Sequence, residues 1–159
     1  MTCVAYPCYL SRFSTVRPSH NAASFTYTSV GSYPNVAYVK EVGDALPMDL
    51  IQNLFKLTRI GDLPQNWNGY GAQPFSYDVI QHSRKVLALL PVQPFISPTA
   101  RNSIQMEYER ANGDYFELEL FDDYFTIYSC IGETEFEHRY AYTETNEKRL
   151  IEGVESFCE

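Results

Sequence analysis

The sequence lacks the features that mark an exported, membrane-spanning or metal-binding protein. Its apolar runs fall well short of the ~20 residues needed to cross a bilayer, and its start shows no apolar stretch after a basic patch, as a secretory signal would. Cys3, Cys8, Cys130 and Cys158 form neither a C-x-x-C unit nor a pair at metal-ligand spacing. We therefore expect a cytoplasmic protein with reduced thiols, with no cofactor and no bound metal.

Acidic residues are missing from the first 40 positions and concentrated at the other end of the chain. Residues 101–159 hold 15 of the 20 acidic residues but only 5 of the 12 basic ones. The net charge of −8 repels phosphate backbones and anionic lipids, so we expect no direct binding to nucleic acid or to membranes. The same charge is compatible with a basic protein partner, including one that itself binds nucleic acid.

The length and composition indicate one domain preceded by an arm. Apolar residues make up 45% of the 159 positions, which is enough for a hydrophobic core. Residues 1–42 are interrupted by proline and glycine, so we expect an irregular arm there, with short strands at 24–30 and 35–39 as the alternative. Residues 43–159 are predicted to form a single α+β domain.

Hydrophobic spacing predicts two helices before the sheet and one after it. The first begins at Asp44 or Ala45 and ends at Gly61; the second is capped by Ser76, and the last by Thr143 or Thr145. Pro91–Thr99 is expected to be a stiff, extended connector. The residues expected to face inward are Leu50, Ile51, Leu54, Phe55 and Thr58, then Val79, Ile80, Ser83, Val86, Leu87 and Leu90, and finally Leu150, Ile151, Val154 and Phe157.

Strict alternation of apolar and polar residues predicts four strands between Ser103 and Tyr142. Strands that follow one another favour an antiparallel β-meander with the helices packed on one face. A two-residue Asn112-Gly113 loop would place Met106 opposite Glu119 and mix the two faces. A three-residue loop with Gly113 at a positive φ keeps the faces consistent, and we predict that loop.

One face of this meander is predicted to be acidic and studded with tyrosine. Directly opposed carboxylates disfavour folding by ~0.2–1 kcal/mol per pair, and a basic partner would relieve that repulsion. The alternative interpretation is that the acids keep the protein soluble and prevent edge-to-edge strand pairing. The residues concerned are Glu107, Glu109, Glu117, Glu119, Glu135 and Glu137, with Tyr124 and Tyr128 between them.

The most distinctive local string is the loop Trp67-Asn68-Gly69-Tyr70-Gly71-Ala72. Two glycines around an aromatic residue indicate a tight turn that lets rings fold back on the helices. Trp67 and Tyr70 are therefore interpreted as packing anchors, and the functional alternative is a protein-binding tip that presents both rings. A phosphate cradle is excluded, because the loop lacks a Lys-Ser/Thr pair and a preceding apolar strand.

Catalysis has little support from the residues. His138 falls on the strand face expected to be buried, and His82 on the wet side of the second helix. Cys130 and His138 would make a nucleophilic pair only if a hairpin brought them together, and no third orienting group is evident. Glu107 and Glu117 could face each other as an acid/base pair, although an open sheet face provides no obvious desolvation. A small hydrolase or transferase using these groups stays an alternative hypothesis.

The stretch from Leu63 to about Tyr128 resembles an uncharacterised family of small bacterial and phage proteins. The similarity rests on 66–72, near the family's W-D-G-Y-G-A, on Phe95-Ile96-Ser97-Pro98-Thr99, on 104–108, near I-Q-L-E-W, and on 116–120, near L-E-I-E-I. Asn68 stands where the family usually has Asp, and Tyr108 where it has Trp. The resemblance implies a mobile-element or toxin–antitoxin-like setting and no active residues.

The leading hypothesis is a non-enzymatic inhibitor: an antitoxin, an immunity protein or an anti-defence protein. It would cover a basic surface of a toxin or nucleic-acid-binding enzyme with the acidic, tyrosine-studded face. Besides the hydrolase or transferase hypothesis, a further alternative is that the protein is a structural or assembly subunit of a phage. In that case the protein would be a homo-oligomer, in which the arm of one copy pairs with the acidic face of another.

Overall fold

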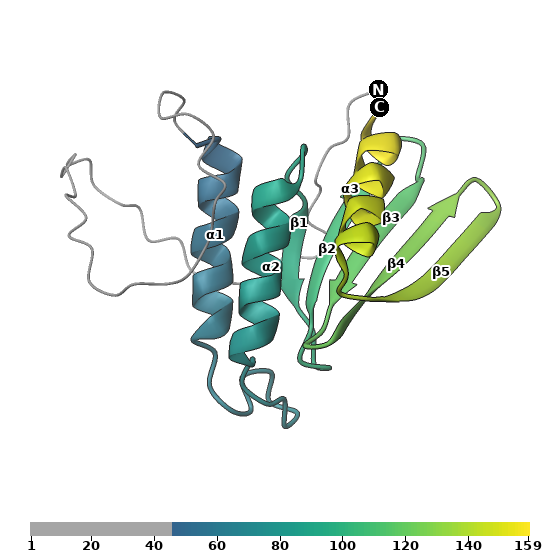
Figure 1. The fold of residues 1–159 in the computed structure, drawn as a ribbon. Coiled ribbons are helices and arrows are strands. Elements are labelled where there is room, and N and C mark those ends of the chain that lie inside the picture. The colour runs from purple at the N-terminus through teal and green to yellow at the C-terminus, as the bar shows by residue number, and fades with distance from the viewer. Residues whose placement is uncertain (1–45) are drawn as a thin grey trace. The chain divides into compact units, whose positions relative to one another are not determined.

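A computed structural model describes residues 46–159, which form an α+β fold of three helices and one sheet (Figure 1). The element order is α1 (Met48–Gly61), α2 (Tyr77–Leu89), β1 (Phe95–Pro98), β2 (Ile104–Glu109), β3 (Tyr115–Leu120), β4 (Tyr124–Ile131), β5 (Thr134–Ala141) and α3 (Glu144–Cys158). The predicted arm, residues 1–42, lies outside the described residues, as do both of its alternative strands.

The sheet is an antiparallel meander in which every strand neighbours the next one in sequence, in the order β1-β2-β3-β4-β5. The expected number of four strands was wrong, because the predicted connector contains β1. Ile96 of β1 pairs with Met106 of β2, and both side chains are fully buried. Prolines close to both ends of β1 hid this short strand in the sequence, but an edge strand tolerates proline at its end.

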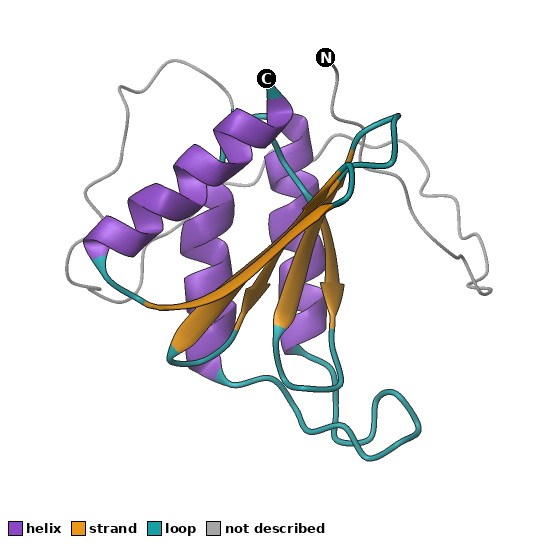
Figure 2. Ribbon diagram, turned by 90° about the vertical axis from the view of Figure 1, so that its right-hand side faces the viewer, coloured by secondary structure: helices purple, strands orange, loops and turns teal. Residues whose placement is uncertain are grey.

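The three helices cover one face of the sheet, which we call the inner face (Figures 1 and 2). Side chains of alternate strand residues fill the space between the sheet and the helices. The buried strand residues are Ile96, Ile104, Met106, Tyr108, Phe116, Leu118, Leu120, Phe125 and Ile127. The residues between them point to the opposite, outer face, which no described helix covers.

The β2–β3 hairpin confirms the three-residue loop. Arg110 and Asp114 flank it, joined by a bond from the Arg110 N–H to the Asp114 carbonyl at 2.9 Å. Gly113 has a φ of 88°, a conformation that glycine adopts without steric cost. Met106 consequently pairs with Leu118, and Glu107 with Glu117, so the two faces stay unmixed along the hairpin.

The buried faces of α2 and α3 are the predicted ones, whereas the buried face of α1 differs from the predicted one. All six residues of the predicted α2 stripe are buried, and Ser76 caps α2 by accepting the N–H of Val79 at 3.1 Å. Thr143 caps α3 in the same way, through the N–H of Asn146 at 3.3 Å.

In α1 the buried residues are Leu50, Leu57 and Ile60, whereas Phe55 is 67% exposed and Ile51 43% exposed. Helix α1 packs mainly against α2 at the side of the sheet, so its buried stripe is narrow and rotated from the expected one. The helix also begins later than predicted, at Met48, directly after Pro47.

Candidate protein-binding face

The outer face carries all eight strand residues that the sequence singled out. The strand register aligns four of them in one row across β2, β3, β4 and β5. In this row Glu107 lies opposite Glu117, Glu117 opposite Tyr128, and Tyr128 opposite Glu137. Glu135 pairs with Cys130 in the neighbouring row. Glu109 and Tyr124 belong to the same set by the alternation of their strands. The predicted strand residues thus share one face of the sheet.

Tyr115 and Gln105 organise the carboxylates at the centre of this face. The Tyr115 hydroxyl lies 2.6 Å from Glu107 Oε1 and 2.8 Å from Glu117 Oε2. Gln105 Nε2 donates to the same two carboxylates, at 3.2 Å and 2.8 Å. These contacts hold two like charges side by side and offset part of their repulsion. Neither residue was among the predicted contact residues, although both lie at alternate positions in register with the glutamates of their strands.

The ionised form of Glu117 is disfavoured at this position. Partial burial raises the pKa of Glu117, an effect that the bonds from Tyr115 and Gln105 oppose and that the nearby charges of Glu119 and Glu107 increase. Burial also raises the pKa of Tyr115, and its bonds to both carboxylates act in the same direction. The hydroxyl therefore stays a donor. A cation placed over Glu107 and Glu117 would favour ionised Glu117.

Glu119 differs from the other glutamates because it is buried, with only 3% of its surface exposed. The Ser103 hydroxyl and the Arg101 guanidinium both donate to its carboxylate, and Thr99 Oγ1 lies 3.4 Å from it. The turn between β1 and β2 supplies all three partners and covers the side chain. The prediction that Glu119 is an exposed contact residue was therefore wrong, since strand alternation identifies the face but not the cover above it.

The tyrosines and one arginine complete the outer face. Arg139 of β5 lies over the Tyr124 ring, 4.0 Å from its centroid, in a cation–π contact. Tyr128 is half-buried beside Tyr115, with 6.2 Å between the ring centroids. Flat rings held among carboxylates provide contact area for the stems of lysine or arginine side chains.

The loop from Asn66 to Ala72 separates the two aromatic residues that were predicted to act together. The Trp67 ring is half-buried and packs on Phe75, with 6.0 Å between centroids. Tyr70 is 93% exposed, so its predicted role as a packing anchor was wrong. The predicted tip that presents both rings does not form, because only Tyr70 is presented.

Hydrogen bonds from backbone N–H groups to two asparagine side chains fix this loop. Asn66 Oδ1 accepts the N–H of Gly71 at 2.7 Å. Asn68 Oδ1 accepts the N–H groups of Tyr70 and Ala72, at 2.8 Å and 3.2 Å. The bonds hold Tyr70 at the apex of the loop, where its ring faces solvent.

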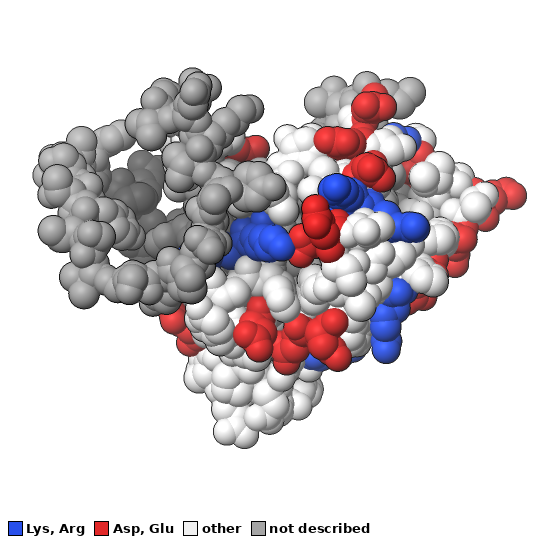
Figure 3. Space-filling model, viewed as in Figure 1, with Lys and Arg blue, Asp and Glu red and all other residues white. Residues whose placement is uncertain are grey.

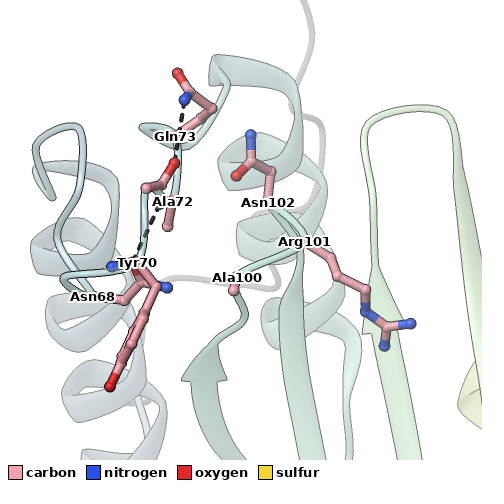
Figure 4. Close-up of a pocket in the computed structure, with 8 residues that line it drawn as sticks. Asn68, Tyr70, Ala72, Gln73, Ala100, Arg101 and Asn102 are labelled. Atoms are coloured by element: carbon pink, nitrogen blue, oxygen red, sulfur yellow. Dashed lines mark hydrogen bonds between the residues drawn. The ribbon is translucent and has the colours of Figure 1, made fainter.

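A shallow hollow of about 350 Å³ lies between this loop and the β1–β2 turn. Asn68, Ala72, Gln73 and Asn102 are among its lining residues. In Figure 4, the Tyr70 and Arg101 side chains diverge rather than converging on a common point. Arg101 also pairs with Glu119. The hollow therefore presents no set of converging groups that would bind a small molecule.

The register keeps Cys130 and His138 apart. Cys130 pairs with Glu135 and points to the outer face, whereas His138 pairs with Ile127 and points to the inner face. His138 is also exposed, so its prediction as a core histidine was wrong. Among the strands, helix α3 packs mainly against β3. His82, expected on a wet face, instead stacks on Tyr142 with 4.0 Å between centroids.

Charges on the opposite side of the molecule are mixed. Figure 3 shows basic and acidic residues interspersed over the helix side, separated by uncharged surface. Within residues 46–159, no group of three His, Cys, Asp or Glu side chains is arranged to hold a metal ion. Among the helices of the same residues, none combines the length and the hydropathy that crossing a membrane requires.

The outer face is therefore the most distinctive chemical surface of the described residues. Its exposed or half-buried carboxylates belong to Glu107, Glu109, Glu117, Glu135 and Glu137. Comparisons of the chain with protein-family models, with curated proteins and with solved structures found no match.

Proposed function

We propose that the protein is a non-enzymatic inhibitor that binds a basic protein through the outer face of its sheet. The observation that carries the proposal is the concentration of five accessible carboxylates and the tyrosines of β3 and β4 on one open sheet face. Such a face complements a surface rich in lysine and arginine and steers it toward contact. Occlusion of that surface would block a toxin or an enzyme that uses it to hold nucleic acid.

The central carboxylates support binding rather than mere solubility. Glu107 and Glu117 are partly buried and directly opposed, whereas charges that serve only solubility avoid such pairing. The donors on Tyr115 and Gln105 fix the orientation of both groups before any partner arrives. A preorganised acceptor pair loses little side-chain entropy when a guanidinium or ammonium binds.

The setting that the sequence resemblance implies is part of this proposal. An antitoxin, an immunity protein or an anti-defence protein that acts on a cationic active region would need a surface of this kind to cover it. Glu107 and Glu117, at the centre of the outer face, lie within 104–108 and 116–120, two of the strings that carry that resemblance. The partner would be a bacterial or phage-encoded protein with a basic surface.

The test compares two double charge reversals of equal size at different places. Glu117→Lys with Glu135→Lys changes the outer face, and Glu152→Lys with Glu155→Lys changes exposed positions of α3. Proteins captured from a bacterial lysate by the tagged wild-type chain are identified by mass spectrometry. The basic protein captured is then purified, and its affinity is measured by calorimetry at low and high salt.

We expect the outer-face variant to bind the partner about tenfold more weakly or worse at low salt. The α3 variant should bind within a few-fold of wild type, because its net charge is the same but its outer face is unchanged. An equal loss of affinity in both variants would show that binding depends on net charge and not on the place of the charges. Unchanged affinity in the outer-face variant would refute the proposed contact face.

A further inference from the structure

The two edges of the sheet are protected very differently. β1 is four residues long and ends in Pro98, and α1 lies along it. Asn53 of α1 donates to the Pro94 carbonyl at 3.0 Å, and Lys56 Nζ lies 4.0 Å from the centroid of the Phe95 ring. Short length, proline and a covering helix are the usual means of blocking an edge. The first edge of the sheet is therefore closed.

In the part of the chain that the structure describes, no element covers the other edge, β5. It is eight residues long, contains no proline, and only Tyr140 among its side chains is even partly buried. Figure 2 shows β5 nearest the viewer, with no helix or strand of the described residues in front of it. A long uncovered edge strand is a template for pairing with another strand.

The hairpin turn decides which backbone groups of β5 are unused. Gly132 and Glu133 form a two-residue loop flanked by the pair Ile131 and Thr134. The flanking pair of such a loop is hydrogen-bonded, and bonded pairs alternate along antiparallel strands. Thr134, Phe136, His138 and Tyr140 therefore bond to β4. The N–H and carbonyl groups of Glu135, Glu137 and Arg139 point away from the sheet.

The side chains of β5 are complementary to a second, antiparallel copy of β5 in one register. When His138 lies opposite His138, Glu137 lies opposite Arg139 twice, and Phe136 lies opposite Tyr140 twice. If the two-fold axis that relates the two strands passed through Glu137 or Arg139, two like charges would lie opposite each other at the axis. If it passed through Phe136, Glu135 would lie opposite Glu137 twice. A shift by one residue would mix the two faces. Among these registers, only the one centred on His138 places Glu137 opposite Arg139 and opposes no like charges.

Apolar groups on the inner side of β5 favour the same register. Phe136 is 47% exposed, and its ring, together with His138 and Tyr140, forms a row with centroid separations of 6.4 Å and 4.5 Å. In the paired arrangement, Phe136 of each copy would pack beside Tyr140 of the other. Cross-strand aromatic pairs of this kind stabilise sheets.

We propose that two copies of this chain associate through β5, antiparallel, about a two-fold axis at His138. Residues 135–141 of each copy pair with 141–135 of the other. The bonded pairs are Glu137 with Arg139, so the outward backbone groups of β5 are used. The two sheets then form one continuous sheet, and the two outer faces form one acidic surface of twice the area. The second copy supplies the strand that the open edge lacks.

Symmetric cross-linking tests the register directly. His138→Cys is placed in a chain whose four natural cysteines are serine, and Phe136→Cys in the same background is the control. Opposed residues have Cα atoms ~4.5–5.5 Å apart, within the disulfide range. In the proposed register the two Phe136 positions are offset by four residues, or about 13 Å along the strand. Mild oxidation should give a covalent dimer of the His138→Cys variant alone.

A charge swap tests the same register without new cysteines. Glu137→Arg and Arg139→Glu should each weaken the dimer about tenfold or more, because each opposes like charges twice. The double variant Glu137→Arg with Arg139→Glu should restore association. Glu135→Arg is the matched control, because Glu135 lies opposite Ala141 in this register. Sedimentation equilibrium of the full chain gives the dissociation constants, and circular dichroism shows whether each variant is folded.

The outcomes separate this proposal from its competitors. A monomer at all concentrations, or equal cross-linking of both cysteine variants, would overturn it. So would a Glu135→Arg variant that weakens the dimer as much as Glu137→Arg does, because that result would move the pairing to another register. A dimer that the double swap does not restore would place the interface elsewhere.

Discussion

Replacing Glu119 by alanine should destabilise the protein by about 2 kcal/mol. Hydrogen bonds to a charged group contribute ~1.5–3 kcal/mol each, and the bond from the buried Ser103 hydroxyl to Glu119 would be lost. Two features limit the cost. Arg101 is 70% exposed and returns to water, so its ion pair adds less than about 1 kcal/mol. Ser103 also keeps Thr99 Oγ1 as a neighbour at 2.5 Å.

Urea unfolding followed by circular dichroism measures this change, and the slope with denaturant should match that of wild type. The midpoint of thermal unfolding should fall by roughly 4–8 °C for a chain of this size. Glu135→Ala is the matched control, since Glu135 is an exposed glutamate on the same face, and it should change stability by less than about 0.5 kcal/mol. Equal stability of the two variants would refute the idea that Glu119 is a structural residue.

Three further changes test the electrostatics and the turns. Glu117→Gln should raise the midpoint of thermal unfolding at neutral pH and leave it less dependent on pH, because the raised pKa of Glu117 means that its ionisation opposes folding; a lower midpoint would contradict this. The N–H of Gly132, with Asn112 and Arg110, lowers the pKa of Asp114, so its stabilisation is present above about pH 4 and lost as the pH falls through the lowered value. Asp114→Asn should therefore make the stability less dependent on pH in the acid range, as measured by acid unfolding monitored by fluorescence. An acid-unfolding curve identical to that of wild type would contradict this. Gly132→Ala should cost about 1 kcal/mol in urea unfolding, because alanine is strained at the φ of 60°, and no loss would mean that the turn rearranges.

The alternation of side chains between the two faces of each strand made the sheet predictable from the sequence. The demand that Met106 and Glu119 stay on different faces was enough to give the loop length and the register of β2 with β3. The same alternation placed Glu107, Glu117 and Tyr128 on one face, and the structure shows that they form one row. These results need only the period of the side chains, which is a local property of the chain.

Depth of burial was not predictable, because it depends on elements distant in sequence. Glu119 is covered by a turn some twenty residues away, and His138 is uncovered because α3 does not reach it. The inward face of α1 was predicted as if the sheet lay directly beneath the helix, but α2 takes that place. β1 was overlooked because its four residues are too few to show alternation.

The sequential order of the strands has a consequence for how the protein forms and comes apart. Within residues 46–159, each strand bonds only to the strands adjacent in the chain, so this part of the sheet needs no long loop closure and relatively rapid folding is favoured. Force applied at the C-terminal end would first detach α3 and then peel β5 from β4, breaking the strand bonds one after another. Such a sheet unzips rather than shears, so it resists pulling far less than its thermal stability would suggest.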